Sequence, residues 1–181
     1  MNLHSLLSTK ERLKILSHVI YQNKPFTINR TAKKLKLSKG LISKYFHILL
    51  KERVLQKSSH GFFVRETPLT KSLKIFLNLN TLDFSGIFKK HRFIKAAGLY
   101  GSLAKGTNTT ESDIDLWLFT EDVEEEKIAK LTNEVKRKSN KIKPVYLTRE
   151  KLIEMRKKDP VFYYALVFGS ISIYGEEIEA I

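Results

Sequence analysis

The chain has 181 residues, of which 42% are hydrophobic and 29% charged, and it contains no cysteine. This composition is typical of globular domains rather than disordered chains, and the lack of cysteine excludes disulfides and thiolate metal sites, as expected for an intracellular, cytoplasmic protein. No apolar run reaches the ~18 residues of a membrane span, and the first ten residues do not resemble a signal peptide, so no membrane partner is predicted.

The net charge of +14 is concentrated in the N-terminal part of the chain. Residues 1–80 contain 16 Lys and Arg against 3 Asp and Glu, whereas residues 81–181 contain 17 against 16. The excess of positive charge in residues 1–80 attracts a polyanion, for which nucleic acid is the leading candidate. An anionic membrane surface would need a basic amphipathic helix, which the pattern in this part does not favour.

Three helices and a hairpin are predicted between residues 9 and 65. Apolar residues at helical spacing predict a first helix over about Thr9–Tyr21. Thr27 and Ser38 are natural N-cap residues, which predict a second helix after Thr27 and a third from Ser38 to about Lys51. A strand, a glycine-containing turn and a second strand over residues 54–65 then predict a β-hairpin.

This order of elements resembles that of winged helix-turn-helix domains of bacterial and archaeal regulators, most closely between Thr27 and Leu55. The resemblance implies that the helix from Ser38 lies in the major groove of double-stranded DNA and that the hairpin is the wing. The implied DNA contacts are Lys39, Ser43, Lys44 and His47 on the helix and Lys57, His60 and Arg65 on the hairpin, with Arg30, Lys33 and Lys34 as further phosphate contacts. A winged helix used for protein contacts is the alternative, and the charge of residues 1–80 argues against it.

Residues 68–92 are predicted to connect two domains, which cover residues 1–67 and 93–181. Apolar positions between Pro68 and Leu79 predict a helix, and a second short helix is predicted over residues 83–90. No Gly/Ser/Pro-rich linker is present, so we expect the domains to be packed or joined by a helix. The sequence leaves the oligomeric state open, although winged helices that read two half-sites do so as homodimers.

A motif of turn residues and carboxylates joins two apolar runs in the second domain. Gly101 and Ser102 end the first run, and ten residues separate Ser102 from Asp113 and Asp115, which open the second. Both runs are predicted to be buried strands. Because side chains alternate along a strand, the two carboxylates project from one face and repel each other unless a cation lies between them.

The chemistry of these residues suits nucleotide phosphates and a metal. Mg²⁺ is bound by one or two carboxylates together with substrate phosphates. Gly101 permits a positive φ and a close approach of the backbone to a phosphate, and Ser102 offers a hydroxyl donor. If residues 103–110 formed a helix, its N-terminal N–H groups would face the same anion.

The motif resembles the signature of the minimal nucleotidyltransferases, small relatives of the polymerase-β palm that include the kanamycin-nucleotidyltransferase type. The resemblance implies transfer of a nucleoside monophosphate from an NTP to a hydroxyl acceptor, with Mg²⁺ or Mn²⁺ as cofactor. It implies that Asp113 and Asp115 are the catalytic metal ligands and that the nucleotide is bound by Gly101, Ser102, Lys105, Gly106 and Ser112.

One residue departs from the family pattern. Active members add a third carboxylate from a later strand, and Lys143 stands at that position in the predicted strand 142–147. A charged lysine cannot ligate a metal and would repel it. A shifted alignment would recruit Asp122 or Glu150, and neither fits the pattern well.

The elements after residue 120 predict an α/β (α+β) domain in which helices flank a mixed β-sheet. A charged helix over 121–138, the strand around Val145, helices over 149–158 and 160–168, and a final strand at 171–175 follow in that order.

Three functions are considered, and the sequence favours the first, an Mg²⁺-dependent nucleotidyltransferase that also binds DNA through its winged helix. Its acceptor is a small molecule, a nucleic acid or a protein, and a separate toxin-like partner is one such protein. The second is a DNA-binding transcriptional regulator with a catalytically degenerate domain that senses nucleotide, which Lys143 favours. The third is an interaction module, against which the retained Ser102, Asp113 and Asp115 argue.

Overall fold

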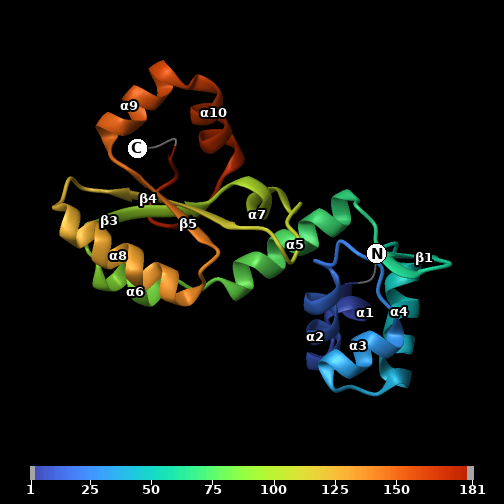
Figure 1. Cartoon of the computed structure of the whole chain (residues 1–181). Coiled ribbons are helices and arrows are strands. Elements are labelled where there is room, and N and C mark those ends of the chain that lie inside the picture. Colours follow the sequence, from blue (N-terminus) through green and yellow to red (C-terminus); the bar gives the residue numbers. More distant parts are fainter. Residues whose placement is uncertain (1–2, 179–181) are drawn as a thin grey trace. The chain divides into compact units, whose positions relative to one another are not determined.

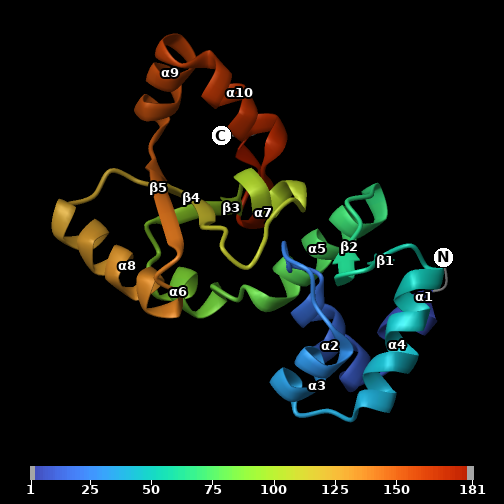
Figure 2. The same ribbon diagram turned by 45° about the vertical axis from the view of Figure 1, so that its right-hand side comes forward.

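The computed structural model describes residues 3–178 and divides the chain into two compact units. Unit 1 contains residues 1–77 together with 107–111, and unit 2 contains residues 78–106 together with 112–181. The segment 107–111 lies between the Gly-Ser pair and the Asp-x-Asp pair in sequence, yet it folds with unit 1. Each unit is described by itself below, and both appear in Figures 1 and 2.

Unit 1 contains the three predicted helices and the predicted hairpin, preceded by a short helix that the sequence analysis did not predict. Its elements are α1 (Leu3–Leu7), α2 (Lys10–Val19), α3 (Ile28–Leu35), α4 (Lys39–Lys51), β1 (Leu55–Ser58) and β2 (Gly61–Val64). The side chains of Thr9, Thr27 and Ser38 accept hydrogen bonds from backbone N–H groups three residues on, which begins α2, α3 and α4. The N-cap predictions for Thr27 and Ser38 are therefore confirmed, and Thr9 is a further N-cap at the predicted start of its helix.

The core of unit 1 extends from the helices to the hairpin. Phe46 of α4 is fully buried and contacts the rings of Phe26 and Phe62 edge-on, with centroids 5.7 and 4.8 Å away. Phe26 and Phe62 also exchange two backbone hydrogen bonds of 3.1 and 2.9 Å. A side chain on Gly61 would collide with the Phe26 carbonyl oxygen, so the pairing of Phe26 with Phe62 requires a glycine at position 61.

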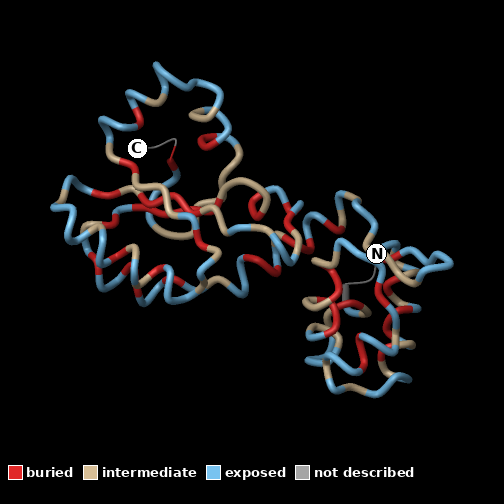
Figure 3. Tube along the Cα trace, in the orientation of Figure 1, coloured by how far each residue is buried: buried red, intermediate tan, exposed pale blue. Residues whose placement is uncertain are grey.

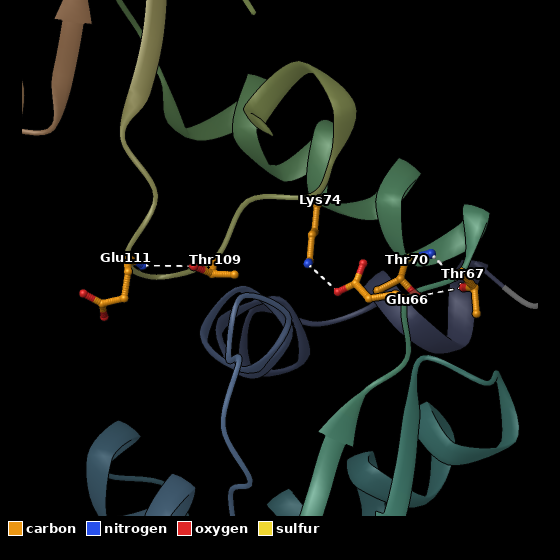
Figure 4. Close-up of polar contacts among 6 residues, drawn as sticks. All are labelled: Glu66, Thr67, Thr70, Lys74, Thr109 and Glu111. Carbon is orange, nitrogen blue, oxygen red and sulfur yellow. Dashed lines mark hydrogen bonds and ion pairs between the residues drawn. The ribbon is translucent and has the colours of Figure 1, made fainter. Parts of the chain in front are cut away.

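The predicted helix after Pro68 is confirmed as α5 (Pro68–Thr81), which begins in unit 1. On it, Lys74 is 2% exposed, and its ammonium group lies 3.0 Å from a carboxylate oxygen of Glu66 (Figure 4). The backbone N–H of Thr110 donates to the carbonyl oxygen of Tyr21 at 3.0 Å. This bond fixes the 107–111 segment to the helical part of unit 1.

Unit 2 is a four-stranded mixed sheet with helices on both faces, as predicted (Figure 1). Its elements are α6 (Ser85–Lys90), β3 (Ile94–Leu99), α7 (Gly101–Lys105), β4 (Ile114–Thr120), α8 (Glu125–Lys138), β5 (Ile142–Leu147), α9 (Arg149–Lys158), α10 (Pro160–Gly169) and β6 (Ile171–Tyr174). The strand order is β5-β4-β3-β6, with β3 antiparallel to β4 and β6, and with β4 parallel to β5 through the α8 crossover.

Alternation along β4 gives the two faces of the sheet different partners. Leu116 and Leu118 pack against α6 and α8, whereas Trp117 packs against α9 and α10. Buried positions therefore follow the strands and the inward sides of the helices (Figure 3). Asp115 shares the parity of Trp117, so it belongs to the face that α9 and α10 cover. Within residues 3–178, no helix is long and apolar enough to cross a membrane.

Candidate functional site

Gly101 and Asp115 pack directly against each other at the ends of two neighbouring strands. Tyr100 follows β3, and its backbone N–H donates to the carbonyl oxygen of Asp115 at 3.1 Å. The next residue, Gly101, has a φ of +65°, and a Cβ built on it would overlap the carboxylate of Asp115. This position therefore needs glycine both for its backbone conformation and for space.

The two carboxylates of the motif interact electrostatically. Asp113 is exposed just before β4, and Asp115 is half-buried as its second residue. Burial raises the pKa of the Asp115 carboxyl, and the negative charge of Asp113 raises it further. Burial also raises the pKa of the Tyr100 phenol, and the negative charge of Asp115 raises it further. A cation between the two aspartates would offset this repulsion.

The helix after the Gly-Ser pair is shorter than predicted. Residues 106–110 are not helical, because α7 covers Gly101–Lys105 and ends at Gly106, whose φ is +64°. The predicted helix is therefore wrong in its bounds, since it begins two residues earlier and ends five residues earlier than expected. Anion binding at this loop would depend on the Gly101 backbone and the Ser102 hydroxyl.

The remaining predicted nucleotide contacts lie around this loop. Ser102 is half-buried in α7, Lys105 is exposed at its last position and Gly106 is buried. Ser112 is half-buried immediately before Asp113. The structure thus brings Gly101 and Asp115 into contact. The side chain of Lys105 is exposed, and in the described part of the chain no hydrogen bond or ion pair holds it.

Asn78 of α5 supports the loop and was missed by the sequence analysis. It is 5% exposed, and its side-chain amide donates to the carbonyl oxygen of Leu103 at 3.0 Å. The bond joins α5 to α7 within unit 2. A single polar residue in an amphipathic helix is ordinarily assigned to the solvent side, so nothing in the local sequence marks this one as buried.

Comparison with known proteins identifies the fold. The family described as polymerase beta, nucleotidyltransferase matches residues 83–179, which is more than half of the chain. The chain belongs to this nucleotidyltransferase family. No curated protein matches it.

One solved structure similar to the chain is a complex of a tri-AMPylated Shewanella oneidensis HEPN toxin with an MNT antitoxin. The matched chain of that complex is 16% identical, and the match covers 59% of this chain and 76% of that one, with a TM-score of 0.38.

Within the nucleotidyltransferase domain, strand register places Lys143 beside Asp115. In the parallel pair β4 and β5, the Cα partners are Asp115 with Lys143 and Trp117 with Val145. Partners in register point to the same face of a sheet, so Lys143 belongs to the face of Asp115. The side chain of Lys143 is exposed, and no ion pair joins it to Asp115 in the described chain.

Asp122 and Glu150 lie at the opposite end of the strands. Asp122 follows the C-terminal end of β4, seven residues beyond Asp115, which corresponds to roughly 23 Å of extended chain. Glu150 likewise follows the C-terminal end of β5, in the first turn of α9. Neither residue can replace the missing third carboxylate.

These donors fit one divalent cation better than two. Asp113 and Asp115 supply two carboxylates, which suffices for one Mg²⁺ or Mn²⁺ that is also bound by nucleotide phosphates. Within residues 3–178, no group of three or more His, Cys, Asp or Glu side chains could hold a metal ion. With Lys143 at the third position, a two-metal centre does not fit the residues present.

The predicted DNA contacts of unit 1 lie on α4 and on the hairpin. Lys39, Lys44 and His47 are exposed on α4, and Ser43 is half-buried. The Nδ1 atom of His47 lies 2.8 Å from the carbonyl oxygen of Ser43, which leaves Nε2 directed away from that bond. On the hairpin side Lys57, His60 and Arg65 are exposed, as are Arg30, Lys33 and Lys34 on α3.

Proposed function

We propose that the chain is a DNA-binding transcriptional regulator whose nucleotidyltransferase domain binds an NTP, with Mg²⁺ or Mn²⁺, as an effector. The observation that carries this proposal is the register of Asp115 with Lys143. The site keeps the parts that suit a triphosphate: Gly101, Ser102 and the carboxylate pair. It lacks the third carboxylate that would complete a two-metal centre, and it has a positive charge in that place.

In this proposal, the chain's own residues position the nucleotide rather than activate an acceptor. The Gly101 backbone approaches the phosphates, the Ser102 hydroxyl donates to them, and Asp113 and Asp115 share the cation. The Lys143 ammonium, on the same face, attracts phosphate oxygens. Lys105, Gly106 and Ser112 border this loop as further contacts.

For DNA binding, the support comes from charge and from the arrangement of unit 1. Sixteen cationic side chains against three acidic ones in residues 1–80 give this part a strong attraction for phosphates. Helix α4 presents Lys39, Lys44 and His47 on its exposed side, next to a hairpin whose cationic residues are also exposed. We propose that α4 is the recognition helix of a winged helix-turn-helix and that the hairpin is its wing.

A second candidate function is transfer of a nucleoside monophosphate from the NTP to a hydroxyl acceptor. Membership of the nucleotidyltransferase family and the intact Gly-Ser and Asp-x-Asp pairs favour it. The acceptor would be a small molecule, a nucleic acid or a separate toxin-like protein. With one metal and no third carboxylate, such transfer is expected to be slow in the native chain.

Titration of DNA in the presence and absence of Mg²⁺ and NTP tests the regulator directly. The probe is a duplex selected by the protein from a random library. We expect NTP to change the DNA affinity by at least about fivefold, the lower end of ordinary coupling between sites. The effect should vanish in the double variant Asp113→Asn, Asp115→Asn, which keeps the DNA-binding residues.

Assay of the same samples with an NTP labelled at the α-phosphate separates the two candidates. If the chain is a regulator, the native chain should label no acceptor. The variant Lys143→Asp should then gain affinity for a second Mn²⁺ per bound nucleotide. Labelled product formed by the native chain, with DNA affinity indifferent to NTP, would instead establish the transferase.

A further inference from the structure

Helix α10 carries an apolar stripe on its outer side. The α10 stripe consists of Val161, Tyr164, Ala165 and Phe168, which follow the i, i+3, i+4, i+7 spacing of one helix face. All four are exposed, and the exposed fractions of Val161, Tyr164 and Phe168 are 80, 45 and 73%. A contiguous apolar surface of this kind marks an interaction site more often than single exposed apolar residues do.

The opposite side of α10 is fixed to the sheet, so the stripe is a rigid surface. Leu166 and Val167 are buried against the face of the sheet that carries Trp117. On the outer side the rings of Tyr164 and Phe168 are stacked, with centroids 5.8 Å apart and planes 3° from parallel. Rings already held in one arrangement lose little side-chain entropy when a partner covers them.

We propose that the α10 stripe binds the α10 stripe of a second copy of this chain, with the two helices antiparallel about a two-fold axis. The side chains of the stripe are complementary in size to those of a second, antiparallel copy. An antiparallel pairing centred between Tyr164 and Ala165 places Val161 opposite Phe168, and Tyr164 opposite Ala165. Each contact thus joins a large side chain to a smaller one, and each occurs twice, as an isologous interface requires.

The distribution of charge also fits a second copy. Helix α10 contains no charged residue, so a two-fold seam brings no like charges together. The last turn of α9 is basic, with Arg156, Lys157 and Lys158, and it leads directly into the N-terminus of α10. In the antiparallel pair this basic turn approaches the C-terminal end of the partner's α10, where the helix dipole favours cations.

The stripe would form the centre of the interface and α9 would extend it. Stable interfaces bury about 800 Å² per partner, more than four side chains of one short helix supply. Ile153 on α9 is a further large apolar side chain that is 53% exposed. This inference is independent of the nucleotide site, and its test involves neither NTP nor DNA.

Sedimentation velocity of the full chain over a range of concentrations, at high salt, tests the proposal. We expect a dimer for the native chain and a dissociation constant at least about 30-fold weaker for Phe168→Glu, as for loss of an interface hot spot. The matched control is Leu79→Glu, since Leu79 is an exposed apolar residue on α5 at 40% exposure. It should dimerise like the native chain, and both variants should keep the native far-UV circular dichroism.

A cysteine crosslink tests the geometry separately. The chain has no cysteine, so a single introduced thiol can form a disulfide only with another copy. Ala165→Cys, beside the proposed axis, should give a crosslinked dimer under mild oxidation, whereas Leu79→Cys should not. A native chain that stays monomeric at every concentration overturns the proposal, and so does a dimer that survives both Phe168→Glu and Val161→Glu. A monomer that binds a helix of another protein through α10 also overturns it.

Discussion

At Gly101 two separate constraints exclude a side chain. The backbone has a φ of +65°, and the space beside the α-carbon is filled by the carboxylate of Asp115. The glycine therefore allows the loop and the carboxylate to share one site. Every other part of the proposed nucleotide site lies within a few residues of this contact or on the neighbouring strand.

Replacement of Gly101 by alanine should abolish NTP binding. The added methyl group must displace Asp115, and the left-handed backbone becomes strained, so we also expect a loss of about 1–3 kcal/mol in the free energy of unfolding. Calorimetric titration and urea denaturation measure the two effects. The control is Gly86→Ala, where a Cβ meets nothing within 4 Å. Native-like NTP affinity in Gly101→Ala would contradict the proposed role of this loop.

At this scale the sequence predicts contacts within the motif better than contacts across the fold. The spacing of Gly101, Asp113 and Asp115 is local, and the two halves of the motif meet because antiparallel strands carry them. The alignment of Lys143 with the missing carboxylate agrees with the strand register. Asn78 could not be predicted, because its partner Leu103 is 25 residues away and is reached only in the folded chain.

Among the elements, α6 and α8 are joined by a small polar network that gives unit 2 a predictable response to acid. Two oxygens of Glu134 on α8 contact the Lys90 ammonium at 2.6 Å and the His91 ring at 3.0 Å. These hydrogen bonds lower the pKa of Glu134 from 4.5 to about 2. Because the folded state favours the carboxylate, its stabilisation is present above pH 4.5 and is lost as the pH falls toward 2.

Replacement of Glu134 by glutamine should remove the stabilisation that its carboxylate gives the folded state. We expect Glu134→Gln to melt at a lower temperature than the native chain near neutral pH, and the difference should shrink as the pH falls below 4.5. Thermal unfolding followed by circular dichroism over this pH range measures it. Glu154→Gln is the matched control, because Glu154 is 58% exposed and its pair with Lys158 lies at the surface. A constant difference at all pH values would rule out this account of Glu134.

Elements were predicted well where caps and apolar spacing are local, and poorly where tertiary contacts decide. Thr9, Thr27 and Ser38 begin their helices as predicted. The helix expected over 103–110 ends instead at Gly106, and residues 107–111 fold with unit 1 through the bond between Thr110 and Tyr21. Gly106 is a helix stop signal that the sequence shows locally. The packing of residues 107–111 against unit 1 depends on tertiary contacts, so the sequence does not show it.

Across the whole molecule, the uneven charge predicts how DNA binding responds to salt. Each phosphate neutralised by a lysine releases counterions, so loss of one contact lowers the slope of log K against log salt by about 0.9. We expect Lys44→Ala, on the exposed side of α4, to show this decrease. Fluorescence anisotropy with a labelled duplex at several salt concentrations measures it.

The control for Lys44→Ala is Lys89→Ala, an exposed lysine on α6 in unit 2. Its slope should equal that of the native chain. Equal slopes for Lys44→Ala and the native chain would show that α4 does not contact phosphates there.

Calorimetric titration of NTP into the native chain, with and without Mg²⁺, tests the central claim most directly. The claim is that Gly101, Ser102, Asp113 and Asp115 form a nucleotide site that requires a cation. We expect saturable binding in Mg²⁺, much weaker binding without it, and no binding by the double variant Asp113→Asn, Asp115→Asn. Failure of every NTP to bind, or equal binding by the native chain and the double variant, would contradict the account.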